Sequence, residues 1–184
     1  NEDSAITNSK RLVQAGAHAV KLEGGKEIEK IIKAVVDSGI PVMGHLGLLP
    51  QTAEKYSVQA KKSDDAVNLL EDARILEKAG VFSIVFEMVT RDVAKIITES
   101  VKVPTIGIGS GINCDGQVLV VHDMLGMFEK IKPKFAKRYL NLSEEIRNAV
   151  NSYVNDVKEK RFPEEEHTFS MKKDELEKLE KEIV

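Results

Sequence analysis

The chain has 184 residues, of which 42% are hydrophobic and 31% are charged, so one domain with a sizeable core is expected. A formal net charge of -3, with Lys and Arg spread along the chain, argues against nucleic acid as a partner. No apolar run is long enough to cross a bilayer, and we expect no membrane partner. Cys114 is the single cysteine and cannot form an internal disulfide, which fits a cytoplasmic, reducing compartment.

Helix-like and strand-like segments alternate along the chain. Apolar residues at helical spacing predict helices, and short apolar runs that follow Ala-Gly or Ser-Gly predict strands. In chain order we predict helix 3–16, strand 17–25, helix 26–39, strand 40–47, helix 63–80, strand 81–89, helix 90–101, strand 103–111, strand 116–126, helix 143–163 and helix 171–184. Ser63 is expected to cap the helix that it opens. This alternation is typical of βαβ units and a parallel sheet.

The two faces of each predicted strand differ in character. Around Val85, for example, Ser83 and Glu87 share a face with it, while Phe82, Ile84, Phe86 and Met88 share the other. Bulky residues under helices, with small or polar residues opposite, favour a (β/α) barrel over an open doubly wound sheet. The length stands against a complete barrel, because about five strands are predicted where the full fold has eight and roughly 250 residues. Either the sheet is open or the chain lacks part of a barrel.

Polar side chains fall at the expected carboxyl ends of successive strands, where parallel barrels gather their chemistry. In chain order these are Lys21 and Glu23, His45, Glu87, Gly109 with Ser110, and finally His122 with Asp123. Gly24 and Gly25 would let the backbone turn closely around a ligand. Glu23, with oxygen-rich neighbours, would suit Mg²⁺, which takes only one or two protein carboxylates.

Each of these features also has a simpler interpretation. Lys21 and Glu23 could form a partly solvated ion pair, and His45 could be a satisfied core histidine. The run GIGSG lacks the G-x-G-x-x-G spacing of a dinucleotide loop, and no histidine spacing predicts zinc. Cys114 has no nearby histidine that would mark it as a nucleophile, so we interpret it as incidental.

Several stretches resemble, in order and spacing, the ketopantoate hydroxymethyltransferase family. These are GAHAVKLEGG, IPVMGHLGLLPQ, VFSIVFEMV, PTIGIGSGINCDGQVLVVHDMLGMF, KPKFAKRY and FPEEEHTF. Leu49 departs from the threonine usual in the family's GHLGLTPQ. The resemblance implies a (β/α)8 TIM barrel of the phosphoenolpyruvate/isocitrate-lyase type. It also implies that the first three strands, with two metal-binding aspartates and a substrate-binding serine, lie outside this chain. Residues 1–169 would then be the barrel domain (strands four to eight), and 170–184 a charged helical extension.

The resemblance implies an enzyme that transfers a hydroxymethyl group from 5,10-methylenetetrahydrofolate to 3-methyl-2-oxobutanoate, toward pantothenate and coenzyme A. Matched position by position, Glu87 is the expected general base and Glu23 an expected Mg²⁺ ligand, direct or through water. Lys21, His45 and Ser110 are the expected substrate-binding residues. The family also implies a homo-oligomer, often a decamer.

Two alternatives stay open. Another Mg²⁺-dependent carbon–carbon lyase of the same barrel superfamily would keep Glu23 but would need no folate. A non-catalytic partial barrel would leave two sheet edges unpaired, which is a liability for an isolated protein. The one-carbon donor could also be a modified pterin in place of folate.

Overall fold

The computed structural model describes residues 1–183, which divide into two compact units. The first consists of Asn1–Val121 and Pro133–Lys137, and the second of His122–Lys132 and the rest of the chain from Arg138. No helix within the described part of the chain is both long and apolar enough to span a membrane.

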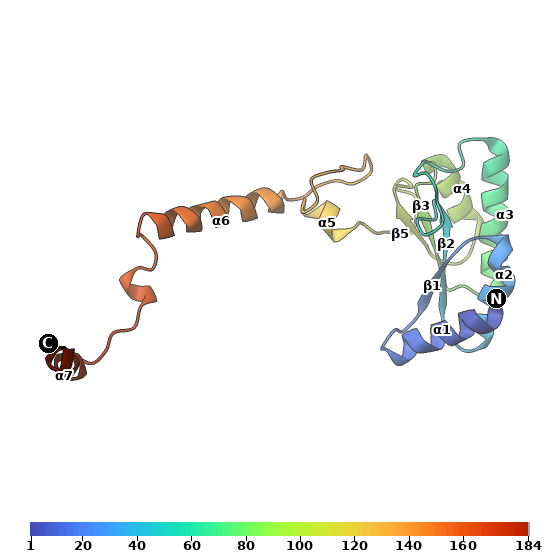
Figure 1. Cartoon of the computed structure of the whole chain (residues 1–184). Coiled ribbons are helices and arrows are strands. Elements are labelled where there is room, and N and C mark those ends of the chain that lie inside the picture. The colour runs from blue at the N-terminus through green and yellow to red at the C-terminus, as the bar shows by residue number, and fades with distance from the viewer. Residues whose placement is uncertain (184) are drawn as a thin grey trace. The chain divides into compact units, whose positions relative to one another are not determined.

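The first unit is built on a parallel sheet of five strands (Figure 1). The strands are β1 (Val20–Glu23), β2 (Val42–Gly47), β3 (Ser83–Glu87), β4 (Thr105–Ile108) and β5 (Gly116–Gln117). Each strand pairs with the next one along the chain, in the order β1-β2-β3-β4-β5. A doubly wound sheet would reverse its order at a switch point, whereas a barrel adds its strands consecutively. The predicted barrel class is confirmed, and this chain supplies five consecutive strands of it.

Helices fill the connections between the strands. They are the short 3-10 turn η1 (Lys26–Ile28) with α2 (Glu29–Asp37), α3 (Ser63–Ala79) and α4 (Arg91–Ser100), while α1 (Glu2–Gln14) precedes β1. α2, α3 and α4 lie on one side of the sheet (Figure 1). The predicted helices are thus present, but α3 begins at Ser63 with Lys62 at the N-cap position. The predicted Ser63 cap is wrong, because Ser63 already has helical geometry.

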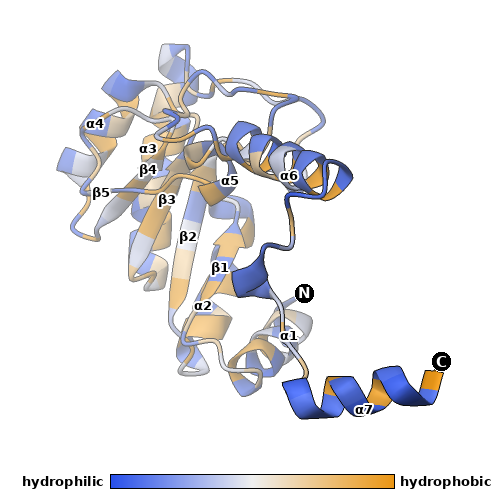
Figure 2. Ribbon diagram, turned by 90° about the vertical axis from the view of Figure 1, so that its left-hand side faces the viewer, coloured by the Kyte–Doolittle hydropathy of each residue, from blue (hydrophilic) through white to orange (hydrophobic). Residues whose placement is uncertain are grey.

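The core lies between the sheet and these helices. Its members alternate along the strands and recur at helical spacing, and they include Val20, Val42, Ile84 and Phe86 from the sheet and Ile32, Val35, Leu76 and Ile97 from the helices. Figure 2 shows the hydrophobic colouring along β3. Burying one such side chain contributes about 1.5–3 kcal/mol, so this layer is what fixes the strand ends in place. Phe82 departs from the predicted pattern, since it precedes β3 and is 44% exposed.

The strand predicted over 116–126 is wrong beyond its first residues. β5 contains Gly116–Gln117 alone, and Val121–Met124 form a short helix, α5. The run of valines has high strand propensity, yet the N–H of Val118 makes the last backbone bond to β4, with the carbonyl oxygen of Gly107. His122 and Asp123 therefore lie in a helix of the second unit and do not end a strand.

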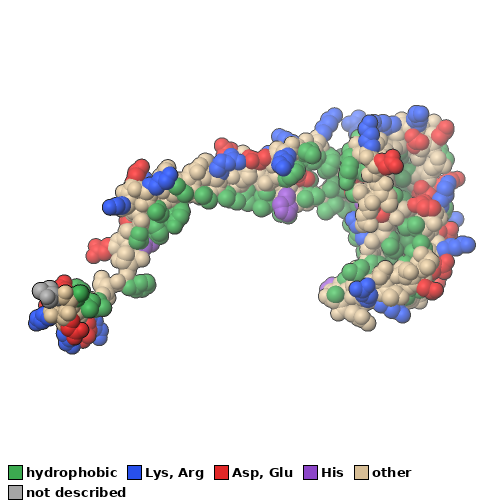
Figure 3. Space-filling model, in the orientation of Figure 1, with side chains coloured by type: hydrophobic (Ala, Val, Ile, Leu, Met, Phe, Trp, Pro, Cys, Tyr) green, Lys and Arg blue, Asp and Glu red, His purple; other side chains and the backbone are tan. Residues whose placement is uncertain are grey.

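The second unit is helical among its described residues. α6 (Leu142–Lys158) and α7 (Lys173–Ile183) match the two helices predicted for this part, with Val184 outside the described residues. Apolar side chains on α6 are exposed in this chain, as Figure 3 shows. The predicted boundary between a barrel domain at 1–169 and an extension at 170–184 stays a prediction.

Gly47 ends β2 with a φ of +94°, and a Cβ there would lie 2.3 Å from the carbonyl oxygen of Glu87. That oxygen accepts the N–H of Leu48 at 2.8 Å. We expect Gly47→Ala to lower the free energy of unfolding by about 2–4 kcal/mol, since it combines left-handed strain with displacement of β3. Urea unfolding measures this. Gly39→Ala is the matched control, because Gly39 has a φ of +84° with nothing within 4 Å. Equal losses in the two variants would contradict the steric argument.

Candidate active site

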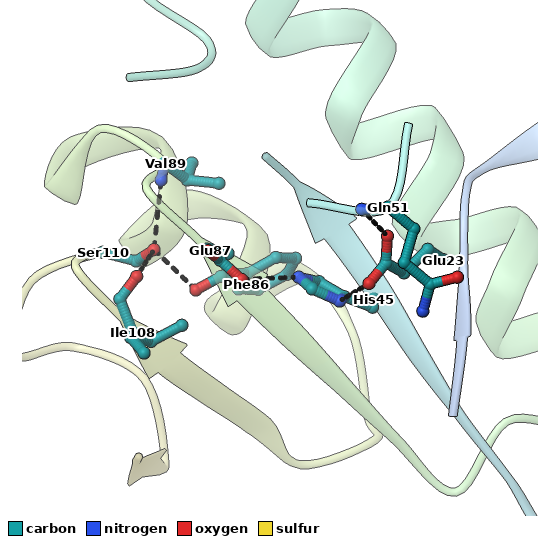
Figure 4. Close-up of polar contacts among 8 residues, drawn as sticks. All are labelled: Glu23, His45, Gln51, Phe86, Glu87, Val89, Ile108 and Ser110. Atoms are coloured by element: carbon teal, nitrogen blue, oxygen red, sulfur yellow. Dashed lines mark hydrogen bonds and ion pairs between the residues drawn. The ribbon is translucent and has the colours of Figure 1, made fainter. Parts of the chain in front are cut away.

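Three predicted site residues meet at the carboxyl ends of adjacent strands. Glu23 of β1 is paired in register with His45 of β2, and β2 in turn pairs with β3, which ends in Glu87. The Nδ1 atom of His45 lies 3.4 Å from Glu23 Oε1, and its Nε2 atom lies 3.3 Å from Glu87 Oε2. Figure 4 shows the imidazole between the two carboxylates. The parallel register therefore produces a line of acid, imidazole and acid.

His45 is almost completely enclosed, with 1% of its side chain exposed. Burial lowers the pKa of His45, the positive charge of Lys21 lowers it further, and Glu23 opposes both. A neutral imidazole has one N–H, so it can donate to one ionised carboxylate, and its other nitrogen can accept a hydrogen bond only from a protonated carboxyl group. The lowered pKa favours a neutral ring, and both of its nitrogens lie close to a carboxylate without a hydrogen bond to any described residue.

Glu87 is held in a partly desolvated position. Burial raises the pKa of Glu87, and the negative charge of Glu23 raises it further, whereas Lys21 lowers it. A carboxyl group with a raised pKa is a better proton acceptor at neutral pH than an ordinary one. This environment strengthens Glu87 as a proton acceptor, and its role as the general base stays a prediction.

Lys21 is exposed and precedes Glu23 by two positions on β1, so both side chains share one face of the strand. Its charge acts on both His45 and Glu87, which places it close to them. A cation at this position would attract an anionic ligand toward the two carboxylates.

Glu23 is anchored from outside its strand. Its Oε2 atom accepts the backbone N–H of Gln51 at 3.2 Å, from the loop after β2. Among residues 1–183, no three His, Cys, Asp or Glu side chains lie close enough together to hold a metal ion. A single carboxylate of this kind still fits Mg²⁺, which fills most of its coordination sphere with water and substrate oxygens.

Ser110 is buried, and its hydroxyl is engaged by the backbone. It donates to the carbonyl oxygen of Phe86 at 2.7 Å and accepts the N–H of Val89 at 3.1 Å. These bonds join the end of β3 to the loop after β4. A contact between Ser110 and substrate stays a prediction.

Cys114 is buried as well, and burial raises the pKa of its thiol, which fits the incidental role predicted for it.

Gly24 and Gly25 leave room for two carboxylates of this chain, which the sequence did not indicate. A Cβ on Gly24 would lie 2.5 Å from Glu27 Oε1, and one on Gly25 would lie 2.3 Å from Asp72 Cγ. Carboxylates of this chain thus pack against both glycines, and a close turn of the backbone around a ligand stays a prediction. Neither Asp72 nor the backbone of Gln51 could be identified from the sequence, because both act across long separations.

The region that contains this site is similar to known proteins. The sequence model described as ketopantoate hydroxymethyltransferase matches residues 1–165. A 3-methyl-2-oxobutanoate hydroxymethyltransferase from Nitrosopumilus maritimus is 59% identical over 98% of this chain and 66% of its own length. One from Clostridioides difficile is 49% identical over 96% of this chain and 66% of its own. The chain belongs to the ketopantoate hydroxymethyltransferase family. The resemblance predicted from the sequence is confirmed, and all five predicted site residues lie inside the matched range.

The chain spans just under two thirds of the length of these ketopantoate hydroxymethyltransferase relatives. Two solved structures are also similar. A dihydrodipicolinate synthase from Agrobacterium tumefaciens has a TM-score of 0.42 and 14% identity over 58% of this chain and 38% of its own. The YdjI aldolase from Escherichia coli has a TM-score of 0.41 and 19% identity over 62% of this chain and 49% of its own.

Proposed function

We propose that the protein is a 3-methyl-2-oxobutanoate hydroxymethyltransferase of pantothenate and coenzyme A biosynthesis. In the reaction, 3-methyl-2-oxobutanoate, 5,10-methylenetetrahydrofolate and water give 2-dehydropantoate and tetrahydrofolate. The observation that supports this most strongly is the line Glu23–His45–Glu87 at the strand ends. The activity named for the relatives requires a base beside a group that stabilises an enolate. In this line Glu87 would be the base, and Glu23 would hold the Mg²⁺ that stabilises the enolate.

Glu87 is the proposed base. It would take the proton from C3 of the keto acid, and the resulting carbon nucleophile would attack the one-carbon unit of the donor. The raised pKa of Glu87 supports this role, because a stronger base removes a carbon-bound proton more readily. His45 Nε2, 3.3 Å from Glu87 Oε2, is placed to hold the carboxylate in one orientation and to share the proton that it accepts.

Glu23 is the proposed Mg²⁺ ligand within this chain, direct or through water. Bound Mg²⁺ would act as a Lewis acid toward the keto and carboxylate oxygens of the substrate. Lys21 would bind the same oxygens and supply a second positive charge where negative charge develops. Ser110 would contribute to the wall of the pocket.

The test uses a completed chain, in which this chain is joined to the part of the Nitrosopumilus maritimus relative that it does not cover. Formation of 2-dehydropantoate is followed with and without 5,10-methylenetetrahydrofolate, and with a modified pterin in its place. Product that requires the one-carbon donor would support the proposal. Cleavage of a keto acid without any donor would point instead to a carbon–carbon lyase. No turnover of either kind would favour a non-catalytic role. Sedimentation of the completed chain would test the proposed homo-oligomer, a decamer by family resemblance, and fractionation of cells would test the cytoplasmic location.

Lys21 gives a prediction about pH. Because its charge lowers the pKa of Glu87, Lys21→Gln should raise that pKa. The base works when deprotonated, so activity falls as the pH drops through its pKa, and this fall should move to higher pH in the variant. The pH profile of deuterium exchange at C3, under saturating keto acid, measures the shift. Lys26→Gln removes the same charge from the next loop and should leave the profile unchanged. A fall that moved to lower pH in Lys21→Gln would contradict the assignment.

A further inference from the structure

The loop that follows Glu23 is held by three successive backbone N–H groups. Gly24 donates to the carbonyl oxygen of His45 at 3.1 Å, and Gly25 donates to Glu27 Oε1 at 2.9 Å. Lys26 donates to Asp72 Oδ1 at 3.0 Å, across 46 positions of sequence. The first bond continues the sheet and the second is local, so the third is the one that ties this loop to the helix layer.

Asp72 lies in α3, the helix that connects the strand of His45 with the strand of Glu87. Its carboxylate packs directly against Gly25, which is buried, because all three of its terminal atoms would lie within 2.6 Å of a Cβ there. The side chain therefore both accepts a hydrogen bond and fills the space that the glycine leaves. A partly buried carboxylate with a backbone donor is a stronger acceptor than a neutral group.

From these contacts we infer that Asp72 is a positioning residue for Glu23, which fixes the Gly24–Gly25 turn and so sets the Glu23 carboxylate against His45 and toward the metal. This inference deepens the proposed function and rests on it for the metal. Asp72 itself touches neither substrate nor metal in this scheme.

The test compares three variants of the completed chain. Asp72→Ala removes the acceptor, and Asp72→Asn keeps an oxygen of the same size at the Oδ1 position. Glu71→Ala is the control, because it removes an exposed carboxylate from the adjacent position of the same helix. The readouts are hydrogen exchange of the segment 23–27 and the Mg²⁺ affinity measured by calorimetry, neither of which needs turnover.

We expect Asp72→Ala to speed amide exchange in this segment by about 10- to 100-fold, the loss that corresponds to a hydrogen bond to a charged group. Its Mg²⁺ affinity should fall by about 5- to 20-fold, as for other groups that orient a metal ligand. Asp72→Asn should fall between the parent protein and Asp72→Ala in both readouts, since it keeps an acceptor oxygen at the Oδ1 position but loses the charge. A merely structural role would speed exchange throughout the helix and would not be rescued by asparagine.

Exchange in Asp72→Ala that matches Glu71→Ala would overturn the inference. So would faster exchange with unchanged Mg²⁺ affinity, because Glu23 would then be set by other contacts. If the parent protein binds no Mg²⁺, the proposed metal site fails, and the exchange comparison alone still decides whether Asp72 holds the turn. The two failures are therefore distinguishable.

Discussion

Glu87→Gln should abolish exchange of the C3 proton of 3-methyl-2-oxobutanoate while keto-acid binding stays within about 3-fold of the parent protein. Glutamine has the same size and can still contact His45 Nε2, which lies 3.3 Å from Glu87 Oε2. It cannot accept a proton, and loss of a general base costs roughly 100- to 10,000-fold in rate. Deuterium exchange followed by NMR measures the effect, and calorimetry measures the binding.

The control for this variant is Glu54→Gln, which makes the same chemical change at an exposed position in the loop after β2. We expect that variant to exchange the C3 proton at the parent rate. Unchanged exchange in Glu87→Gln would reject Glu87 as the base. The acid–imidazole contact would then have to serve binding instead of proton transfer.

Glu23 should have the second large effect, on metal binding. In Glu23→Gln and Glu23→Ala we expect the Mg²⁺ affinity to fall by at least about 10- to 100-fold, because the carboxylate charge is lost. The two variants should differ in stability. Alanine removes the acceptor of the Gln51 N–H and the partner of His45 Nδ1, which costs about 1–3 kcal/mol, whereas glutamine keeps the oxygen.

Calorimetric Mg²⁺ titration and urea unfolding test these two statements separately. A metal titration curve identical to that of the parent protein would remove Glu23 from the metal site. Glu23→Gln should also lower the pKa of Glu87, since the negative charge of Glu23 raises it. The acid side of the exchange profile should therefore move to lower pH, opposite in direction to the Lys21→Gln shift.

The sequence was sufficient for the sheet and for the approximate position of the site. Strand-helix alternation reflects local apolar periodicity, which needs no knowledge of distant contacts. Because the carboxyl ends of parallel strands share an edge, Glu23, His45 and Glu87 could be expected to meet once they were placed at strand ends. The prediction of a strand over 116–126 was wrong because it rested on local propensity. Propensity alone cannot say whether a partner strand is available beyond Gln117.

The tertiary structure decided what each polar group contacts. The hydroxyl of Ser110, predicted to bind substrate, also bonds the backbone of Phe86 and Val89, which the sequence did not indicate. The Gly24–Gly25 pair was predicted to turn closely around a ligand, and the structure adds Asp72, packed against Gly25 and 46 positions beyond Lys26. Hydrogen bonds between residues that are far apart in the sequence depend on strand register and helix packing. The spacing of apolar residues along the chain does not specify either of them. Residue types and spacing thus determined which polar groups lie at the strand ends, while long-range packing determined which atoms each of those groups contacts.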